Sequence, residues 1–187
     1  MRLILASASP RRAELLTSAG FTFAVAPADV DETARPGEDP APYALRVARD
    51  KASAAARGAA GEVVLAADTV VVVDGRILGK PRDRADATRM LEALSGRVHE
   101  VLTAVVLRHG DAERSEVVTT RVHVSALTQA DIAWYLGTGE WEGKAGAYAI
   151  QGQAARYVER IEGSWSNVVG LPIATVHRLL NRARDGD

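Results

Sequence analysis

Residues 63–73 read VVLAADTVVVV, an apolar run that is interrupted only by Asp68 and Thr69. A continuous apolar run without polar alternation predicts a strand that is buried on both faces. The Asp74-Gly75 dipeptide that follows predicts a hairpin, with residues 76–78 as its return strand. Proteins of the α/β class place ligands at the carboxyl ends of buried strands, so Asp68 is a candidate site residue.

The rest of the chain predicts helices that alternate with strands. Helices are expected over residues 10–19, 43–57, 86–94, 128–136 and 171–184. Strands are expected over residues 2–6, 21–26, 99–107, 117–124, 147–150 and 156–161, and loops over residues 27–42, 137–146 and 163–170. No internal repeat or linker divides the sequence, so one domain is expected over residues 1–187. Interleaved helices and strands, some joined by hairpins, indicate an α/β fold with a mixed sheet.

Composition narrows the class of protein. The 187 residues carry a formal net charge of −1, so no overall field attracts nucleic acid or an anionic membrane. Cysteine is absent, which excludes disulfides and thiolate chemistry. No stretch reaches the ~20 apolar residues that a membrane span needs. Polar residues from Ser7 onward also interrupt the apolar N-terminus before a signal peptide could form. We therefore expect a soluble, cytoplasmic protein.

The first candidate site is residues 7–12, Ser-Ala-Ser-Pro-Arg-Arg. Ser9 and Pro10 fit the start of a helix, whose N-terminal N–H groups favour anions. Two cations in a first helical turn oppose the helix dipole unless an anion binds there. Arginine also binds phosphate oxygens in bidentate fashion. We therefore expect a phosphate site that includes Ser7, Arg11 and Arg12.

Other candidates are weaker on their own. The chain has only three lysines, Lys51, Lys80 and Lys144, so each is a candidate for a place where arginine would not serve. Asp68 suits either a general base or a magnesium ligand, and the sequence leaves both roles open. The Asp31-Glu32 pair is a second candidate for a divalent cation. The glycine-flanked Gln151 could read the edge of a base. The alternative is that none of these residues has a functional role: Lys80 would be a solvated lysine in a turn, Lys51 a solvated lysine on a helix face, and Asp31-Glu32 part of a solvated loop.

Several enzyme classes are excluded by their missing motifs. The sequence holds no Walker A loop, no Gly-x-Ser-x-Gly elbow and no His-Glu-x-x-His. The four histidines are scattered and show no spacing typical of metal ligands. The three tryptophans are too dispersed for a base-stacking platform, and Trp134 is expected in the core.

The motifs together resemble the Maf family of nucleoside triphosphate pyrophosphatases over nearly the whole length. The resemblance rests on seven blocks in order: residues 5–16, 48–52, 67–71, 79–81, 94–96, 144–152 and 168–172. It implies a mixed, elongated central sheet flanked by helices, with two lobes around a cleft, as in the Maf and ITPase-like folds. It also implies hydrolysis of a nucleoside triphosphate to the monophosphate and pyrophosphate, which removes unwanted nucleotides from cellular pools.

The resemblance also implies roles for individual residues. Asp68 is implied as the general base, with phosphate contacts from Ser7, Arg12, Lys51 and Lys80. A divalent cation, Mg²⁺ or Mn²⁺, is implied, and Asp68 and Glu32 are the expected ligands. The branch that acts on dTTP and UTP carries Arg, Thr and Gln at three positions, which here are Arg11, Thr69 and Gln151. The family usually forms dimers, so we expect a homodimer without a stable nucleic-acid partner or a membrane.

Four alternative functions remain open from the sequence. The first is a pyrophosphatase for 7-methyl-GTP or another modified nucleotide, although that branch carries Trp, Gln and Glu at the three positions. The second is a nucleotide-binding regulator of cell division without catalysis. The third is an Arg-rich nucleic-acid-binding protein, which the balanced charge disfavours. The fourth is a related pyrophosphatase for purine triphosphates such as ITP, which the three positions and the block of residues 7–12 disfavour.

Overall fold

The computed structural model describes residues 2–59 and 61–185. Seven strands form one mixed sheet in the order β2-β1-β3-β5-β6-β7, and β4 pairs with β3 outside this path. The chain divides into two compact units. The first comprises residues 1–69, 103–118 and 170–187, and the second comprises residues 70–102 and 119–169. The expected mixed α/β fold with a central sheet and flanking helices is confirmed. The expectation of one domain over residues 1–187, whose residues 1, 60, 186 and 187 lie outside the described part, stays a prediction.

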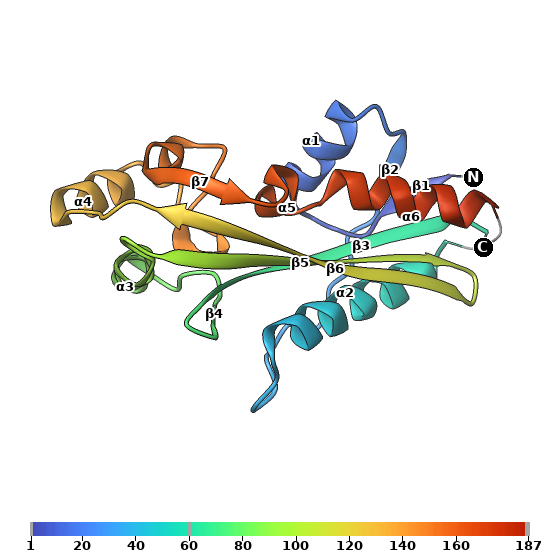
Figure 1. The fold of residues 1–187 in the computed structure, drawn as a ribbon. Coiled ribbons are helices and arrows are strands. Elements are labelled where there is room, and N and C mark those ends of the chain that lie inside the picture. Colours follow the sequence, from blue (N-terminus) through green and yellow to red (C-terminus); the bar gives the residue numbers. More distant parts are fainter. Residues whose placement is uncertain (1, 60, 186–187) are drawn as a thin grey trace. The chain divides into compact units, whose positions relative to one another are not determined.

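The first unit contains the parallel part of the sheet. Strand β1 (Leu3–Leu5) pairs in parallel with β2 (Phe23–Val25) and with β3 (Val63–Val73). Parts of two further strands, β5 (Val98–His109) and β6 (Ala112–Val124), also belong to the first unit. Helix α2 (Pro40–Ala56) lies against one face, and α1 (Pro10–Ser18) and α6 (Ile173–Asp185) lie against the other (Figure 1). Helices on both faces explain why β3 has an apolar run without alternation.

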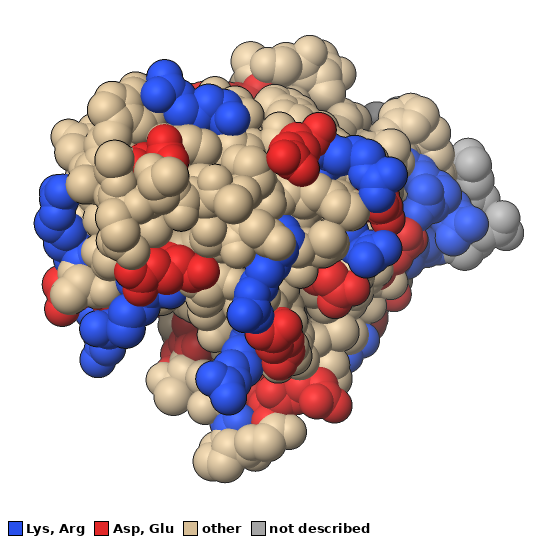
Figure 2. Space-filling view, turned by 60° about the vertical axis from the view of Figure 1, so that its left-hand side comes forward, with Lys and Arg blue, Asp and Glu red and all other residues tan. Residues whose placement is uncertain are grey.

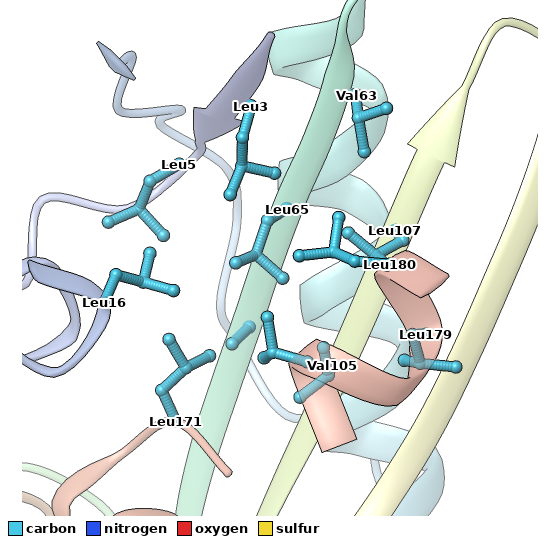
Figure 3. Packing of buried hydrophobic residues seen from close by; sticks show 12 residues of the cluster. Leu3, Leu5, Leu16, Val63, Leu65, Val105, Leu107, Leu171, Leu179 and Leu180 are labelled. Carbon is cyan, nitrogen blue, oxygen red and sulfur yellow. The ribbon is translucent and has the colours of Figure 1, made fainter. Parts of the chain in front are cut away.

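Alternation along β3 decides which face each site residue occupies. Leu65 and Ala67 belong to a buried cluster with Leu16 of α1 and Leu179 of α6, as Figure 3 shows for the leucines. Successive side chains of a strand point to opposite faces. Thr69 therefore shares the face of Leu65, and Asp68 lies on the opposite face, which α2 covers.

The second unit contains the remaining elements. These are β4 (Arg76–Leu78), α3 (Arg84–Leu94), α4 (Gln129–Gly137), η1 (Ala145–Ala147), η2 (Gln153–Tyr157), β7 (Val158–Glu162) and α5 (Trp165–Val169). Helices α3 and α4 pack together through Leu91, Ile132 and Tyr135. Asp74 and Gly75 have φ of 49° and 74°, the positive values that a tight hairpin turn requires. The hairpin between β3 and β4 is thereby confirmed.

Three sequence-based expectations in this unit are wrong. Residues 147–150 form no strand, because Gly146 and Ala147 have φ of 68° and 59°, outside the range of extended backbone. Residues 163–170 include the short helix α5, where the Ser164 hydroxyl accepts a hydrogen bond from the Asn167 N–H at 3.3 Å. Trp134 is 41% exposed, and the Arg156 guanidinium lies 3.7 Å from the centroid of its ring.

The charge distribution on the surface and the hydropathy of the helices both agree with the composition. Acidic and basic side chains are interspersed on the face shown in Figure 2, as the net charge of −1 suggests. Among the helices that the structure describes, none is long and apolar enough to cross a membrane.

Candidate active site

The candidate site lies where β1 ends beside β3. Leu5, the last residue of β1, is paired with Leu65, and β3 continues beyond it to Val73. Ser7 follows β1, while Asp68 and Thr69 lie on the part of β3 that extends past the pairing. The carboxyl end of a parallel strand is where α/β folds bind ligands. The local topology therefore gathers Ser7, Asp68 and Thr69 at this edge of the first unit.

An ammonium between two carboxylates occupies the α2 side of this edge. Lys51 Nζ lies 2.8 Å from Asp68 Oδ1 and 2.6 Å from Glu32 Oε1. The side chains of Lys51 and Asp68 are each about one-tenth exposed, whereas that of Glu32 is 43% exposed. Lys51 comes from the middle of α2 and Glu32 from the loop that precedes this helix. A loop, a helix and a strand thus meet around one cation.

Burial controls the protonation of Asp68. Loss of water raises the pKa of this carboxyl above its ordinary value, and the negative charge of Glu32 adds to the rise. The positive charges of Lys51 and Arg12 and the hydrogen bond from Lys51 act in the opposite direction but do not cancel the effect of burial. A carboxyl with a raised pKa is a better proton acceptor than an exposed one.

A buried guanidinium occupies the opposite side of the edge. Arg12 Nε donates to the Gly170 carbonyl at 2.8 Å, Nη1 to Ser7 Oγ at 3.0 Å and Nη2 to Thr69 Oγ1 at 3.0 Å. Burial lowers the pKa of Arg12, while Asp68 raises it. Because protein groups satisfy this cation, its place in the first turn of α1 does not require an anion. A phosphate site was expected here because two cations in a first helical turn oppose the helix dipole unless an anion binds. The hydrogen bonds of Arg12 to the protein remove that argument.

The start of α1 differs from the expected cap. Ser9 is the N-cap residue and Pro10 follows it, but the Ser9 hydroxyl makes no capping hydrogen bond. Instead, Ser7 Oγ accepts from the Ser9 N–H at 3.3 Å. Arg11 is half-buried, and its Nε has no hydrogen-bond partner among residues 2–59 and 61–185. Burial lowers the pKa of Arg11. Arg11 Nε is therefore a buried donor without a partner in the described part of the protein, next to Arg12 in the chain.

Two expected site residues belong to the second unit. Lys80 and Gln151 are both exposed. The Gly146 N–H donates to the Gly79 carbonyl at 3.1 Å, which ties the turn before Lys80 to the segment before Gln151. The structure thus connects the two segments to each other. Their participation with the residues of the first unit stays a prediction.

Sequence reasoning missed two contributors to the Arg12 network. The backbone of Gly170 accepts from Arg12 and has φ of 130°, which favours glycine. Thr103 Oγ1 lies 3.0 Å from Thr69 Oγ1 and is fully buried on β5. Thr103 could have been found from the sequence, because it is the one hydroxyl residue in the apolar stretch of residues 101–107. Gly170 carried no signal beyond its place in a motif.

The carboxylates offer a limited set of metal ligands. No group of three or more His, Asp or Glu side chains suited to a metal occurs in the part of the chain that the structure describes. Asp68 and Glu32 converge on one cationic group, the ammonium of Lys51. Magnesium is commonly held by one or two carboxylates, with substrate phosphates and water as the other ligands. The pair therefore fits a metal that binds together with a phosphate substrate.

Comparisons with known proteins agree on the family. The family model described as Maf-like protein matches residues 2–183. A protein of Anaeromyxobacter dehalogenans (strain 2CP-1 / ATCC BAA-258), named dTTP/UTP pyrophosphatase, is 55% identical, and the match covers 97% of this chain and 94% of that protein. A protein of the same name from Koribacter versatilis (strain Ellin345) is 54% identical, with coverage of 98% and 95%.

A solved structure is similar in fold. The Staphylococcus aureus Ham1 protein matches with a TM-score of 0.50 and 17% sequence identity, over 66% of this chain and 72% of that one. At this identity, the match shows the fold alone. Over 97% of its length, however, the chain matches curated relatives at more than half identity. The chain therefore belongs to the Maf-like protein family.

Proposed function

We propose that this protein hydrolyses dTTP and UTP to the nucleoside monophosphate and pyrophosphate, and so removes these nucleotides from cellular pools. The observation that carries the proposal is the buried contact between Lys51 and Asp68 at the carboxyl end of β1. Relatives of more than 50% identity that bear the name dTTP/UTP pyrophosphatase support it. The enzyme is accordingly a hydrolase that acts on a phosphoric anhydride.

Asp68 is the residue that takes the proton. Water attacks the α-phosphorus, a new P–O bond forms, and the bond from that phosphorus to the oxygen bridging it to the β-phosphorus breaks. Pyrophosphate leaves with the electron pair of that bond. The proton of the attacking water passes to Asp68, whose raised pKa makes it a stronger base than an exposed carboxylate. Lys51 fixes the orientation of this carboxylate at 2.8 Å.

Cationic side chains neutralise the triphosphate. Little covalent chemistry is required of the protein in phosphoryl transfer, so positioning and charge stabilisation carry most of the effect. Arg11 offers a half-buried guanidinium, and the Ser7–Arg12 hydrogen bond lies beside it. Lys80 supplies a further cation to the transferring or leaving phosphates.

A divalent cation belongs to the proposal. Asp68 and Glu32 are the residues that would hold Mg²⁺ or Mn²⁺, with phosphate oxygens of the substrate as further ligands. When bound, the metal would supply Lewis-acid stabilisation of the charge on the phosphates. Lys51 Nζ contacts both carboxylates and so holds them near each other.

Three side chains select the base. Arg11, Thr69 and Gln151 match the residues that the dTTP and UTP branch of the family carries. The hydroxyl of Thr69 is fixed by Arg12 and Thr103, at 3.0 Å from each. A branch that acts on 7-methyl-GTP carries other residues at these positions, so we favour the pyrimidine nucleotides.

We also infer a cytoplasmic homodimer that has no stable nucleic-acid partner. The absence of cysteine and the balanced charge support this setting. A substrate panel tests the proposed function: dTTP, UTP, CTP, ITP and 7-methyl-GTP are incubated with Mg²⁺ or Mn²⁺, and the products are identified. Pyrophosphate release from dTTP and UTP above the others is expected. Binding of these nucleotides without turnover would favour the non-catalytic regulator.

A further inference from the structure

The loop of residues 31–38 raises a question of positioning. It carries Glu32, whose carboxylate lies 2.6 Å from Lys51 Nζ. No regular secondary structure holds the loop, and the Glu32 side chain is 43% exposed. Lys51 is largely buried, but the exposed Glu32 side of the pair is screened by water, which limits how far the ion pair alone orders the loop. Some other feature must fix the position of Glu32.

Helix α2 provides that feature through two side chains. The Tyr43 hydroxyl donates to the backbone carbonyl of Glu32 at 2.7 Å. Arg46 Nη2 donates to the Thr33 carbonyl at 3.0 Å. Two successive backbone carbonyls of the loop are therefore bound to the helix that also carries Lys51.

A bidentate ion pair closes the other end of the loop. Arg46 Nε and Nη2 each donate to a carboxylate oxygen of Glu38 at 2.7 Å. The two side chains are 17% and 11% exposed, and the pair has the fork geometry of a strong charge-assisted contact. The Arg46 hydrogen bonds lower the pKa of Glu38 to about 2, so the pair stays ionised at neutral and mildly acidic pH.

An open space lies between part of the loop and α2. A cavity of about 380 Å³ is lined by residues 33–36 of the loop and by Arg46 and Asp50 of α2. Polar contacts therefore connect loop and helix across an open space. Arg46 supplies most of these contacts, and the Tyr43 ring lies 5.5 Å from its guanidinium.

We infer that Arg46 is a positioning residue for Glu32. Arg46 binds Thr33 and Glu38, and with Tyr43 it fixes the loop so that the Glu32 carboxylate meets Lys51 opposite Asp68. Without Arg46 the loop loses its ion pair, and Glu32 moves away from Lys51. The kinetic part of this inference rests on the proposed function, whereas the placement of Glu32 does not.

The kinetic test is a double-mutant cycle. Arg46→Gln is expected to lower kcat for dTTP about tenfold with little change in KM, as the loss of a group that orients a ligand does. The same substitution in a Glu32→Gln background is expected to have no further effect. An equal loss in both backgrounds would overturn the inference. Arg49→Gln is the matched control, because Arg49 lies on the same helix but pairs with Glu113 of β6.

A labelling test needs no turnover. The chain has three lysines, so the acylation rate of Lys51 can be followed by mass spectrometry against Lys80 as an internal reference. Arg46→Gln should make Lys51 react several-fold faster and leave Lys80 unchanged. If Lys51 reacts as slowly as in the wild type, the inference is wrong, even where the enzyme shows no pyrophosphatase activity. Should Arg46→Gln fail to fold, Tyr43→Phe is used, because it removes the hydrogen bond from the Tyr43 hydroxyl to the Glu32 carbonyl. Faster acylation of Lys51 in this variant would support the inference, and an unchanged rate would overturn it.

Discussion

Lys51 Nζ lies 2.8 Å from Asp68 Oδ1, and each of these two side chains is about one-tenth exposed. Removing one partner of a buried ion pair leaves the other charge without compensation. The pair also joins the two structural elements on which the site depends, because Lys51 belongs to α2 and Asp68 to β3. The contact thus sets the position of the proposed base and opposes the rise that burial causes in the pKa of Asp68.

Substitution of Asp68 by Asn is expected to abolish turnover while the triphosphate still binds. The amide keeps the size of the carboxyl and can accept from Lys51, but it cannot take a proton from water. Single-turnover measurements with dTTP and an equilibrium binding assay check both parts. Single-turnover activity near that of the wild type would remove Asp68 from the mechanism.

The acidic limb of the pH profile is expected to reflect Asp68. Only the deprotonated carboxylate accepts a proton, so kcat/KM should fall as the pH decreases through the pKa of Asp68. Because burial raises this pKa, the fall should begin above the ordinary carboxyl value of about 4.

A substitution at Glu32 tests this assignment. The negative charge of Glu32 raises the pKa of Asp68, so Glu32→Gln should move the acidic limb to lower pH. Glu116→Gln serves as the control, since Glu116 pairs with Arg178 and is not among the groups that shift Asp68. A limb that stays in place in Glu32→Gln would assign it to another group.

Lys80 is expected to stabilise the transition state. Lys80→Ala should cost about 2–4 kcal/mol in kcat/KM, the usual effect of losing one preorganised charge donor. Arg82→Ala removes a neighbouring exposed cation that pairs with Asp86, and it should leave kcat/KM nearly unchanged. Unchanged kinetics in Lys80→Ala would exclude Lys80 from the site.

Two glycines with the same backbone conformation should differ in their tolerance of alanine. Gly143 and Gly146 have φ of 66° and 68°. A Cβ at Gly143 would meet nothing within 4 Å, whereas at Gly146 it would lie 2.9 Å from Val71 Cγ1. Gly143→Ala should cost about 1 kcal/mol for the left-handed conformation, and Gly146→Ala about 1–3 kcal/mol more for the steric conflict. Thermal or urea unfolding measures the difference, and equal losses would contradict the close approach.

The buried strand and the hairpin of residues 63–78 could be predicted because local signals and burial agree there. The apolar run needs two covering layers, and Asp74-Gly75 supplies the positive φ values of the turn. Residues 147–150 were wrongly predicted to form a strand because their apolar composition suits one. The left-handed backbone at Gly146 and Ala147 depends on tertiary contacts with Gly79 and Val71. Trp134 was wrongly predicted to lie in the core, because the sequence does not show that Arg156 covers one face of its ring at the surface.

Part of the candidate site could also be predicted. Arg12 contacts both Ser7 and Thr69, since their positions follow from the ends of strands and the start of a helix, and the roles of these residues stay a prediction. The meeting of Lys51, Asp68 and Glu32 could not be derived from spacing, because it depends on how α2 packs on the sheet. The hydrogen bonds of Tyr43 and Arg46 to the loop depend on the same packing. No periodicity in the sequence encodes such contacts.

The central claim is that water attacks the α-phosphorus of dTTP or UTP. Hydrolysis in ¹⁸O-labelled water, followed by mass spectrometry of both products, tests it most directly. The account predicts one ¹⁸O atom in the nucleoside monophosphate and none in the pyrophosphate. Label in the pyrophosphate, or release of inorganic phosphate and a nucleoside diphosphate, would contradict it.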